Sequence, residues 1–481
     1  MAASVKQLYL HPLTLESTLF LNSLEVCGKI YNRIDPYLYD SLRNVVLGIE
    51  KFLDQNPTVI EPTDDFMFVT PKELAVIPKI YHCTFCKKNL GSTVDKAAIH
   101  LAERHPTAKT VNLPKRAKAI VESDFGKFFA DQLQVAETLK QIPEYDVIEN
   151  SLSDILKEVF PDKSIEMYKF GSRITGIGTE NSDLDIYVDI GGRFNEFEHA
   201  ATAETLQIFD RAYYVFKNKT IDWRLNHAAR GARIPILKLT NTRTKIKCDV
   251  GFSNSISYCN KQMLEYIFQQ QPIARRMCIF MKKWLELTGL NRRITTYCMS
   301  LMVIYYLQIN NFLPSIETLQ KNMLANVLVG PWISNFIEIP LTELKMEVLS
   351  VSPSSCKQHI KEFFIYYADF DYESHVICPY FGRTHIKIEN FESLMPERYT
   401  NFVQSKNSAK DFRIELDKHM VVQDPLRMNH NVAERVTKVD LMEWQHFLKK
   451  SAVLIIVVRS WRNNDLIYTS KYPACFATHR E

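Results

Sequence analysis

Residues 170–190 read Phe170-Gly-Ser-Arg-Ile-Thr-Gly-Ile-Gly-Thr-Glu-Asn-Ser-Asp-Leu-Asp-Ile-Tyr-Val-Asp-Ile190. From Asp183 onward apolar residues occupy every second position, which predicts a β-strand over 183–190 with one apolar face. Asp183 and Asp185 share the opposite face, roughly 6 to 7 Å apart, close enough to bind hard cations that prefer oxygen ligands. An Asp-x-Asp pair by itself is more typical of a solvent-exposed strand face, so the residues around it decide its meaning.

Glycine is concentrated around this pair of acids. Only 14 of the 481 residues are glycine, and five of those lie between Gly171 and Gly192. A chain with so little glycine elsewhere needs unusual backbone geometry in this stretch. Backbone amides freed by Gly171, together with the Ser172 hydroxyl, can hold the terminal phosphates of a nucleotide. The pattern therefore indicates a phosphate site beside the two acids.

A third acid follows on a second expected strand. In Ile246-Lys-Cys-Asp-Val-Gly-Phe252 the apolar residues alternate, which leaves Asp249 on the other face. Three acids on two strands are sufficient for two-metal nucleotidyl transfer with Mg²⁺ or Mn²⁺. Asp189 is in phase with the first pair but lies farther along its strand, so we expect a surface or hydrogen-bonding acid there.

The composition is that of a globular protein. Hydrophobic residues make up 46% of the chain, charged residues 24% and aromatic residues 11%, which excludes the disordered and collagen-like classes. The net charge of +4 permits but does not require an anionic partner. No signal peptide or membrane-spanning run is expected, and ten scattered cysteines suit reduced thiols. We therefore expect a cytoplasmic protein without a membrane partner.

Four residues near the N-terminus have the spacing of a Cys2His2 zinc finger. Cys83, Cys86, His100 and His105 form the pattern Cys-x2-Cys-x13-His-x4-His. A turn holding the cysteines and a helix holding the histidines can complete a tetrahedron around one Zn²⁺, and so small a unit depends on the metal to fold. The finger could contact RNA or only brace its neighbour, and the sequence leaves both open.

The order of Gly-Ser, Asp-x-Asp and a distal Asp resembles the DNA polymerase β nucleotidyltransferase superfamily. Other motifs are similar to the noncanonical poly(A) polymerases and terminal uridylyltransferases. They are Cys248-Asp-Val-Gly-Phe-Ser-Asn254, Asn260, Met281-Lys-Lys-Trp284, Thr295-Thr-Tyr297, Phe363-Phe-Ile-Tyr-Tyr-Ala-Asp-Phe-Asp371, and Asp424-Pro425 with His430-Asn431. The resemblance covers about 120–445 and looks closest to the uridylyltransferases of insects.

The resemblance implies a role for each matched residue. The implied site is Asp183, Asp185 and Asp249 for catalytic metal binding, Gly171, Ser172 and Lys282 for the triphosphate, Asn260 for the ribose, Thr296 and Tyr297 for the base, and His430 for the uracil edge. Without the resemblance, Tyr297 is more typical of a core tyrosine and a histidine at 430 of a polar loop. Three positions depart from the family, since Glu286 replaces a second lysine, Lys261 a threonine and Thr296 a serine. Another cation, such as Lys283, could compensate for Glu286.

The expected fold is α+β. A nucleotidyltransferase palm, which is a mixed sheet with helices, packs on a helical poly(A)-polymerase-associated domain and is preceded by the Cys2His2 zinc finger. We expect a helical region and linker over 1–75, the finger over 78–110, helices of the central helical domain over 115–164, the palm over 165–255, the nucleotide-recognition domain over 256–450 and a C-terminal segment over 451–481. The periodicity also favours one helix inside the palm, around 203–216.

The activity that the resemblance implies is template-independent transfer of UMP from UTP to single-stranded RNA 3′ ends by a two-metal mechanism. A cytoplasmic noncanonical poly(A) polymerase with the same machinery is the first alternative. The second is a catalytically inactive zinc-finger RNA-binding scaffold, which retention of all three acids disfavours. His430 separates the first two, because poly(A)-preferring relatives generally lack this histidine.

Overall fold

The computed structural model describes residues 112–455, except 254, 322, 324, 325 and 408. The chain divides into two units, residues 1–110 and 111–481, and the described residues belong to the second. The expected helical region over 1–75 and the proposed zinc ligands Cys83, Cys86, His100 and His105 lie outside the described residues.

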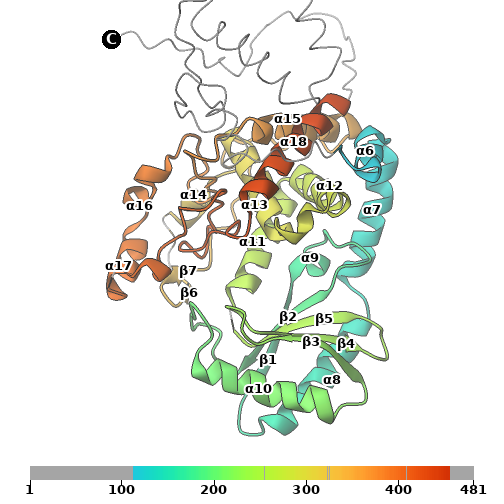
Figure 1. Cartoon of the computed structure of the whole chain (residues 1–481), viewed down its shortest axis with the longest axis vertical. Helices are drawn as coiled ribbons and strands as arrows, with labels where there is room; N and C mark the ends of the chain where they lie inside the picture. The colour runs from blue at the N-terminus through green and yellow to red at the C-terminus, as the bar shows by residue number, and fades with distance from the viewer. Residues whose placement is uncertain (1–111, 254, 322, 324–325, 408, 456–481) are drawn as a thin grey trace, which may run out of the picture. The chain divides into compact units, whose positions relative to one another are not determined.

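A five-stranded sheet occupies one end of the described part (Figure 1). Its strands are β1 (Ile165–Phe170), β2 (Leu184–Ile190), β3 (Trp223–Ala229), β4 (Ile236–Asn241) and β5 (Lys247–Gly251), in the order β1-β2-β5-β4-β3. The pair β2–β5 is parallel, and the other three pairs are antiparallel. The mixed sheet expected from the sequence is therefore confirmed.

One face of the sheet is apolar and is covered by two helices. The alternating residues predicted for β2 and β5 are buried, namely Leu184, Ile186, Val188 and Ile190, and Ile246, Cys248, Val250 and Phe252. They share a core with side chains of α8 (Glu144–Val159) and α10 (Ala203–Asn218), such as Leu152 and Phe209. We expected all of 115–164 to join the helical domain, but α8 packs on the palm sheet because its apolar stripe faces this core.

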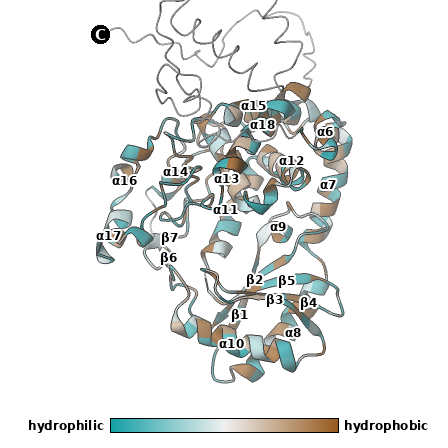
Figure 2. Ribbon diagram, in the orientation of Figure 1, coloured by the Kyte–Doolittle hydropathy of each residue, from teal (hydrophilic) through white to brown (hydrophobic). Residues whose placement is uncertain are grey.

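A second and larger core is helical. Its main helices are α6 (Lys115–Glu122), α7 (Phe125–Lys140), α11 (Ile256–Gln270), α12 (Pro272–Thr288), α13 (Thr296–Ile309), α15 (Pro353–Ala368) and α18 (Lys438–Leu454). Every residue of α13 from Cys298 to Gln308 is buried, so this helix is surrounded by its neighbours. Figure 2 shows brown, hydrophobic segments among the helices of this layer.

Shorter elements connect these helices and strands. They are α9 (Gly171–Ile174), α14 (Ile316–Gln320), α16 (Phe391–Leu394), α17 (Glu397–Ser405), β6 (Leu328–Val329), β7 (Trp332–Ile333) and the 3-10 helices η1 (Leu290–Arg292), η2 (Ile388–Asn390) and η3 (Lys410–Phe412). The helix α18 continues to Leu454, past the boundary expected at residue 450. None of the described helices combines the length and apolar character that crossing a membrane requires.

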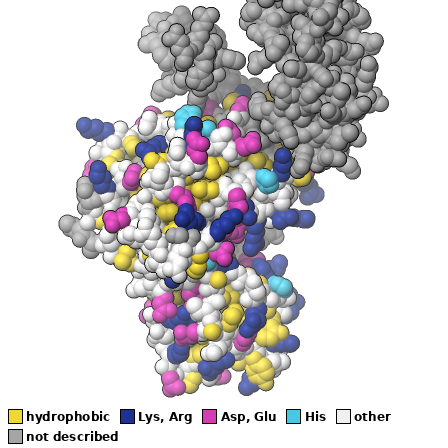
Figure 3. Space-filling model, turned by 60° about the vertical axis from the view of Figure 1, so that its left-hand side comes forward, with side chains coloured by type: hydrophobic (Ala, Val, Ile, Leu, Met, Phe, Trp, Pro, Cys, Tyr) yellow, Lys and Arg dark blue, Asp and Glu magenta, His cyan; other side chains and the backbone are white. Residues whose placement is uncertain are grey.

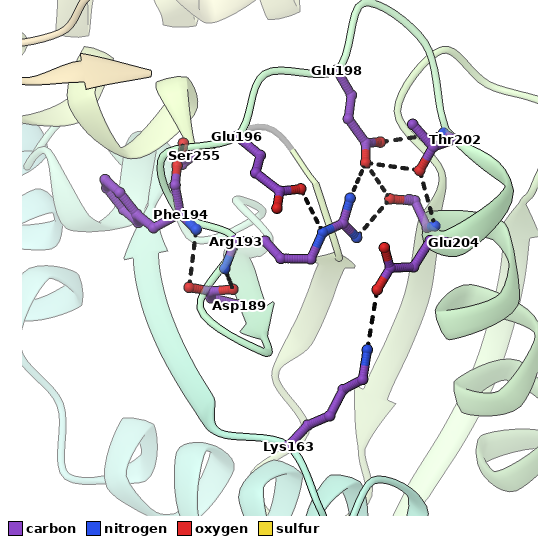
Figure 4. A network of polar contacts seen from close by, with 10 residues as sticks. Lys163, Asp189, Arg193, Phe194, Glu196, Glu198, Thr202, Glu204 and Ser255 are labelled. Atoms are coloured by element: carbon purple, nitrogen blue, oxygen red, sulfur yellow. Dashed lines mark hydrogen bonds and ion pairs between the residues drawn. The ribbon is translucent and has the colours of Figure 1, made fainter. Parts of the chain in front are cut away.

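A buried polar network holds the connection between β2 and α10 (Figure 4). The carboxylate of Asp189 accepts hydrogen bonds from the backbone N–H groups of Arg193, at 2.7 Å, and Phe194, at 3.1 Å. The Arg193 guanidinium contacts Glu198, and the Ser255 hydroxyl donates to the Phe194 carbonyl at 2.5 Å. Asp189 is therefore a hydrogen-bonding acid and not a surface acid, and its loop joins the palm to the start of α11.

Candidate active site

Two of the predicted acids lie directly opposite each other on neighbouring strands. Asp185 of β2 is the register partner of Asp249 of β5, and Asp183 immediately precedes β2. Burial, together with the negative charges of Asp249 and Asp183, raises the pKa of Asp185 to about 7. Three carboxylates thus influence one another at one edge of the sheet, where a bound cation would offset their repulsion.

Asp249 also has a cationic neighbour on the next strand. Lys238 of β4 is its register partner, and the Lys238 Nζ lies 2.5 Å from the Asp249 Oδ2. Burial raises the pKa of Asp249, while Lys238 acts in the opposite direction. No three His, Cys, Asp or Glu side chains converge closely enough to hold a metal ion among the residues that the structure describes. A divalent ion would relieve the repulsion among the acids, but binding it would require the carboxylates to move closer together and Asp249 to release Lys238.

Gly171 brings the backbone against the Asp185 carboxylate. It begins α9 directly after β1 and has a φ of +78°, a region that L-residues with a side chain rarely adopt. A Cβ at this position would lie 1.8 Å from the Asp185 Oδ2, which no real contact allows. The glycine is therefore required both for the turn and for the close approach to the acid.

The first prediction concerns this approach. We expect Gly171→Ala to lower the nucleotidyl transfer that the sequence resemblance implies by at least about a hundredfold, because the added methyl group displaces the Asp185 carboxylate. Gly192→Ala is the matched control, since Gly192 has a similar φ of +73° but no atom within 4 Å of the added Cβ. Both variants carry similar backbone strain of about 1 to 2 kcal/mol. Initial rates and thermal melting of the two proteins are compared, and equal rates would refute the role of the contact.

A buried lysine joins the helical core to the phosphate-binding segment. Lys282 of α12 donates hydrogen bonds to the hydroxyl groups of Ser172, at 2.8 Å, and Ser182, at 2.6 Å. Burial lowers the pKa of Lys282 to about 8, although Glu286 and Asp185 favour its charged form. Ser172 and Lys282, which the resemblance assigns to the triphosphate, therefore lie together. Ser182, which the sequence analysis did not assign, belongs to the same hydrogen-bonded group.

Two of the residues that depart from the family pattern, Glu286 and Lys261, pair with nearby side chains. The Lys283 Nζ lies 3.7 Å from the Glu286 Oε2, and the Thr179 hydroxyl donates to Glu286 at 3.3 Å. The Lys261 Nζ lies 2.6 Å from a Glu265 carboxylate oxygen, one helical turn away. Lys283, which we expected to compensate for the lysine that Glu286 replaces, is thus already paired with Glu286.

The residues matched to the ribose and base meet at a buried carboxylate. The Asp424 Oδ2 lies 3.4 Å from the Asn260 Nδ2 and 3.8 Å from the His430 Nδ1. Burial and the charge of Asp424 hold the pKa of Tyr297 well above its usual range. Thr296 is half-buried beside Tyr297 in the first turn of α13. One acid therefore brings together three side chains that are far apart in the sequence.

Hydrogen bonds make the loop that carries Asp424 and His430 rigid. The Asp424 Oδ1 accepts from the backbone N–H groups of Leu426 and Arg427, both at 3.0 Å. The backbone N–H of Asp424 donates to the His430 carbonyl at 3.0 Å, which closes the loop. Asn431 receives two backbone N–H groups on its Oδ1 and donates through its Nδ2 to two carbonyls. The Asp-Pro and His-Asn pairs of the sequence thus form one preorganised turn.

Two buried polar atoms beside Asp424 have no hydrogen-bond partner among the described residues. They are the Oδ1 of Asn260 and the hydroxyl of Tyr297. An unpaired buried polar atom costs about 1 to 3 kcal/mol. A ligand that hydrogen-bonds to these atoms would recover this free energy, which fits a binding site better than a structural core.

Sequence reasoning assigned no role to three residues of these clusters. Ser182 is adjacent to Asp183, and Asp424 lies in a motif already recognised, so both had a signal. Arg233, in the connection between β3 and β4, contacts His430 and had none. Its partner lies 197 residues away, beyond any local periodicity.

The three acids lie on or beside two neighbouring strands of the mixed sheet, and the buried lysine contacts the segment between β1 and β2. Residues 122–269 match the family described as poly(A) RNA polymerase, mitochondrial-like, central palm domain. Terminal uridylyl transferase 4 from Trypanosoma brucei, solved with bound UTP and UMP, has the same fold, with a TM-score of 0.50 and 20% identity over 70% of this chain and 99% of that one.

Curated relatives include terminal uridylyltransferases and poly(A) RNA polymerases. Terminal uridylyltransferase 7 of Homo sapiens is 20% identical over 438 residues, which cover 86% of this chain and 26% of the relative. Terminal uridylyltransferase cid1 of Schizosaccharomyces pombe is 24% identical over 63% of this chain and 71% of its own length. Poly(A) RNA polymerases are also among the relatives. The chain therefore spans only about a quarter of the human relative's length.

Proposed function

We propose that this protein is a template-independent RNA 3′-terminal uridylyltransferase. The observation that carries the proposal is the meeting of Asn260, Tyr297 and His430 at Asp424, in a chain whose palm also carries the three acids and the Ser172–Lys282 contact. The two unpaired polar atoms beside Asp424 support a nucleoside ligand. The relatives support both uridylyl and adenylyl transfer as reaction classes.

In the proposed reaction the RNA 3′-hydroxyl oxygen attacks the α-phosphorus of UTP. A new phosphodiester bond forms, the hydroxyl proton passes to water, the bond between the α-phosphorus and its bridging oxygen breaks, and pyrophosphate leaves with the electron pair. Asp183, Asp185 and Asp249 would hold Mg²⁺ or Mn²⁺, which supply the charge that activates the hydroxyl and neutralises the leaving group. Ser172, Ser182 and Lys282 bind the triphosphate, and the Asn260 Oδ1 accepts a hydrogen bond from a ribose hydroxyl.

His430 provides the proposed choice of base. The uracil edge presents the O4 acceptor where cytosine and adenine present an amino group. A histidine that donates a hydrogen bond at this edge therefore favours uracil and opposes the other two bases. A noncanonical poly(A) polymerase remains the second candidate, because poly(A) RNA polymerases are among the relatives.

The second prediction tests this choice directly. With equimolar nucleotides, Mg²⁺ and a single-stranded RNA, we expect the purified protein to add UMP faster than AMP. Replacing the histidine, as His430→Ala, should lower the ratio of kcat/KM for UTP to that for ATP by roughly tenfold or more. Faster addition of AMP by the unaltered protein would overturn the uridylyl assignment, and an unchanged ratio in the variant would assign His430 to the loop alone.

A binding role without catalysis has less support. An RNA-binding scaffold is expected to gather Lys and Arg on one surface. On the face of the described residues drawn in Figure 3, Lys and Arg side chains are interspersed with Asp and Glu. We also propose that Cys83, Cys86, His100 and His105 bind Zn²⁺, for which metal analysis of the full chain is the test.

A further inference from the structure

An arginine from the palm contacts His430, the histidine that we propose recognises the base. Arg233 lies in the connection between β3 and β4, and its Nη2 is 2.6 Å from the His430 Nε2. Arginine has only donor hydrogens and keeps its charge at physiological pH. The His430 Nε2 must therefore be the acceptor of this hydrogen bond and cannot carry a proton while the contact exists.

The same contact determines the protonation of the other ring nitrogen, Nδ1. A neutral imidazole that accepts at Nε2 carries its proton at Nδ1. The His430 Nδ1 lies on the side of Asp424, 3.8 Å from its Oδ2, in the cluster with Asn260 and Tyr297. The donor hydrogen of His430 is thus directed toward the side chains assigned to the nucleoside.

The charged groups around His430 also favour the neutral ring. Burial lowers the pKa of His430, and the positive charges of Arg233 and Arg427 act in the same direction, while Asp424 opposes them. His199, from the connection between β2 and α10, is close enough for its own pKa to respond to His430. The geometry and the surrounding charges therefore agree on one protonation state.

Arg233 is itself held in place. Its Nη1 lies 3.4 Å from the Glu434 Oε2, and both side chains are 26% exposed. Glu434 follows the rigid loop of Asp424 and His430, so the arginine is tied to the segment that it contacts. The contact is thus a bridge from the palm to the base-reading loop and not a freely moving surface cation.

We propose that Arg233 is a positioning residue that fixes the Nδ1–H tautomer of His430 and thereby sets the discrimination between uracil and the amino-bearing bases. This inference rests on the proposed function. In the fixed tautomer Nδ1–H donates to the uracil O4, whereas the amino group of cytosine or adenine meets a second donor. Without Arg233 only the Asp424 carboxylate, 3.8 Å from Nδ1, still favours the Nδ1–H tautomer, so the Nε2–H tautomer, which has no donor at Nδ1, becomes more populated.

The kinetic test uses Arg233→Met, which keeps bulk and removes the donor. At pH 8 we expect the ratio of kcat/KM for UTP to that for CTP to fall about tenfold, while kcat for UTP changes less. At a pH low enough to protonate His430, which lies below the usual histidine pKa because burial lowers the pKa of this ring, the ratio should recover, since protonated His430 again donates from Nδ1. Arg233→Lys, which restores a donor, should regain part of the ratio at pH 8. A ratio that is unchanged, or that falls equally at every pH, would overturn the proposal.

The control is an arginine of the same connection. Arg230 forms a bidentate ion pair with Asp210, in which Nε lies 2.7 Å from Oδ1 and Nη2 lies 2.8 Å from Oδ2. It lies outside the His430 cluster. Arg230→Met removes the same charge three residues away, so it should leave the UTP to CTP ratio unaltered. An equal fall in both variants would mean that general positive charge, and not the contact with His430, determines the ratio.

A spectroscopic test separates this proposal from the proposed function. The full chain is labelled with ¹⁵N in its histidine rings, and the His430 signals are assigned by their loss in His430→Gln. We expect a protonated Nδ1 and an unprotonated Nε2 in the unaltered protein at pH 8, and a mixture or the reverse in Arg233→Met. Nε2–H in the unaltered protein would overturn the positioning role. A protein that prefers ATP but shows the Nδ1–H tautomer would refute the uridylyl assignment and support the contact.

Discussion

Asp185→Asn is expected to reduce nucleotidyl transfer by at least about a thousandfold while RNA binding stays within about twofold. Asp185 is opposite Asp249, feels the charge of Asp183 and touches the backbone of Gly171, so it is central to the acid cluster. The amide removes one ligand charge but also removes like-charge repulsion, so the fold should persist. Extension assays measure the loss of activity, RNA anisotropy titrations measure RNA binding, and thermal melting measures whether the fold persists, all on one preparation.

Asp189→Asn is the matched control for this variant. Asp189 is on the same strand and in phase with Asp185, but its carboxylate binds the backbone N–H groups of Arg193 and Phe194. The asparagine oxygen can still accept one of these bonds, so we expect some loss of stability and at most a modest loss of activity. Normal extension by Asp185→Asn would remove that acid from the site. An equal loss in a folded Asp189→Asn would remove the distinction between the two acids.

Lys282→Met is expected to raise the KM for UTP by about ten- to a hundredfold. The variant loses the cation that binds Ser172 and Ser182, where the triphosphate is proposed to lie. Because burial lowers the pKa of Lys282 to about 8, its charge is present below that pH and is lost above it. We therefore expect kcat/KM of the unaltered protein to fall between about pH 7.5 and 9.

Two further variants isolate the contribution of this lysine. Lys282→Arg keeps a charge that does not titrate in this range, so the fall in kcat/KM above pH 8 should disappear. Lys283→Met removes the neighbouring charge, which already pairs with Glu286, and should change the KM much less. If Lys282→Met shows the same pH profile as the unaltered protein, another group causes the alkaline fall.

The parts of the fold that could be predicted from sequence are those in which apolar residues recur with the short period of a strand or a helix. Alternation in 183–190 and 246–252 correctly predicted the buried face of β2 and β5, because side chains of a strand alternate between its faces. The helix expected around 203–216 is confirmed as α10. The acids Asp185 and Asp249 could be assigned to one face, but their exact opposition depends on the register of two strands that are distant in sequence.

The remaining features depend on contacts that no local pattern encodes. The apolar stripe of α8 predicted a helix but not which of two cores it would join. Asp189 has the same phase as Asp185, yet it is buried because the following loop folds back onto its carboxylate. The role of Asp424 as a shared partner also required the spatial arrangement, since Asn260 precedes it by 164 residues.

The contact of Lys282 with Ser172 and Ser182 has a thermodynamic consequence. The serines belong to the palm segment and the lysine to the helical core, so a triphosphate bound there as proposed would be a ligand of the joined form only. Mass action would then add stability against separation of the cores, about 2.7 kcal/mol at a free nucleotide concentration one hundred times Kd. Under the proposed function, the nucleotide concentration would therefore affect the protein's resistance to unfolding as well as its rate.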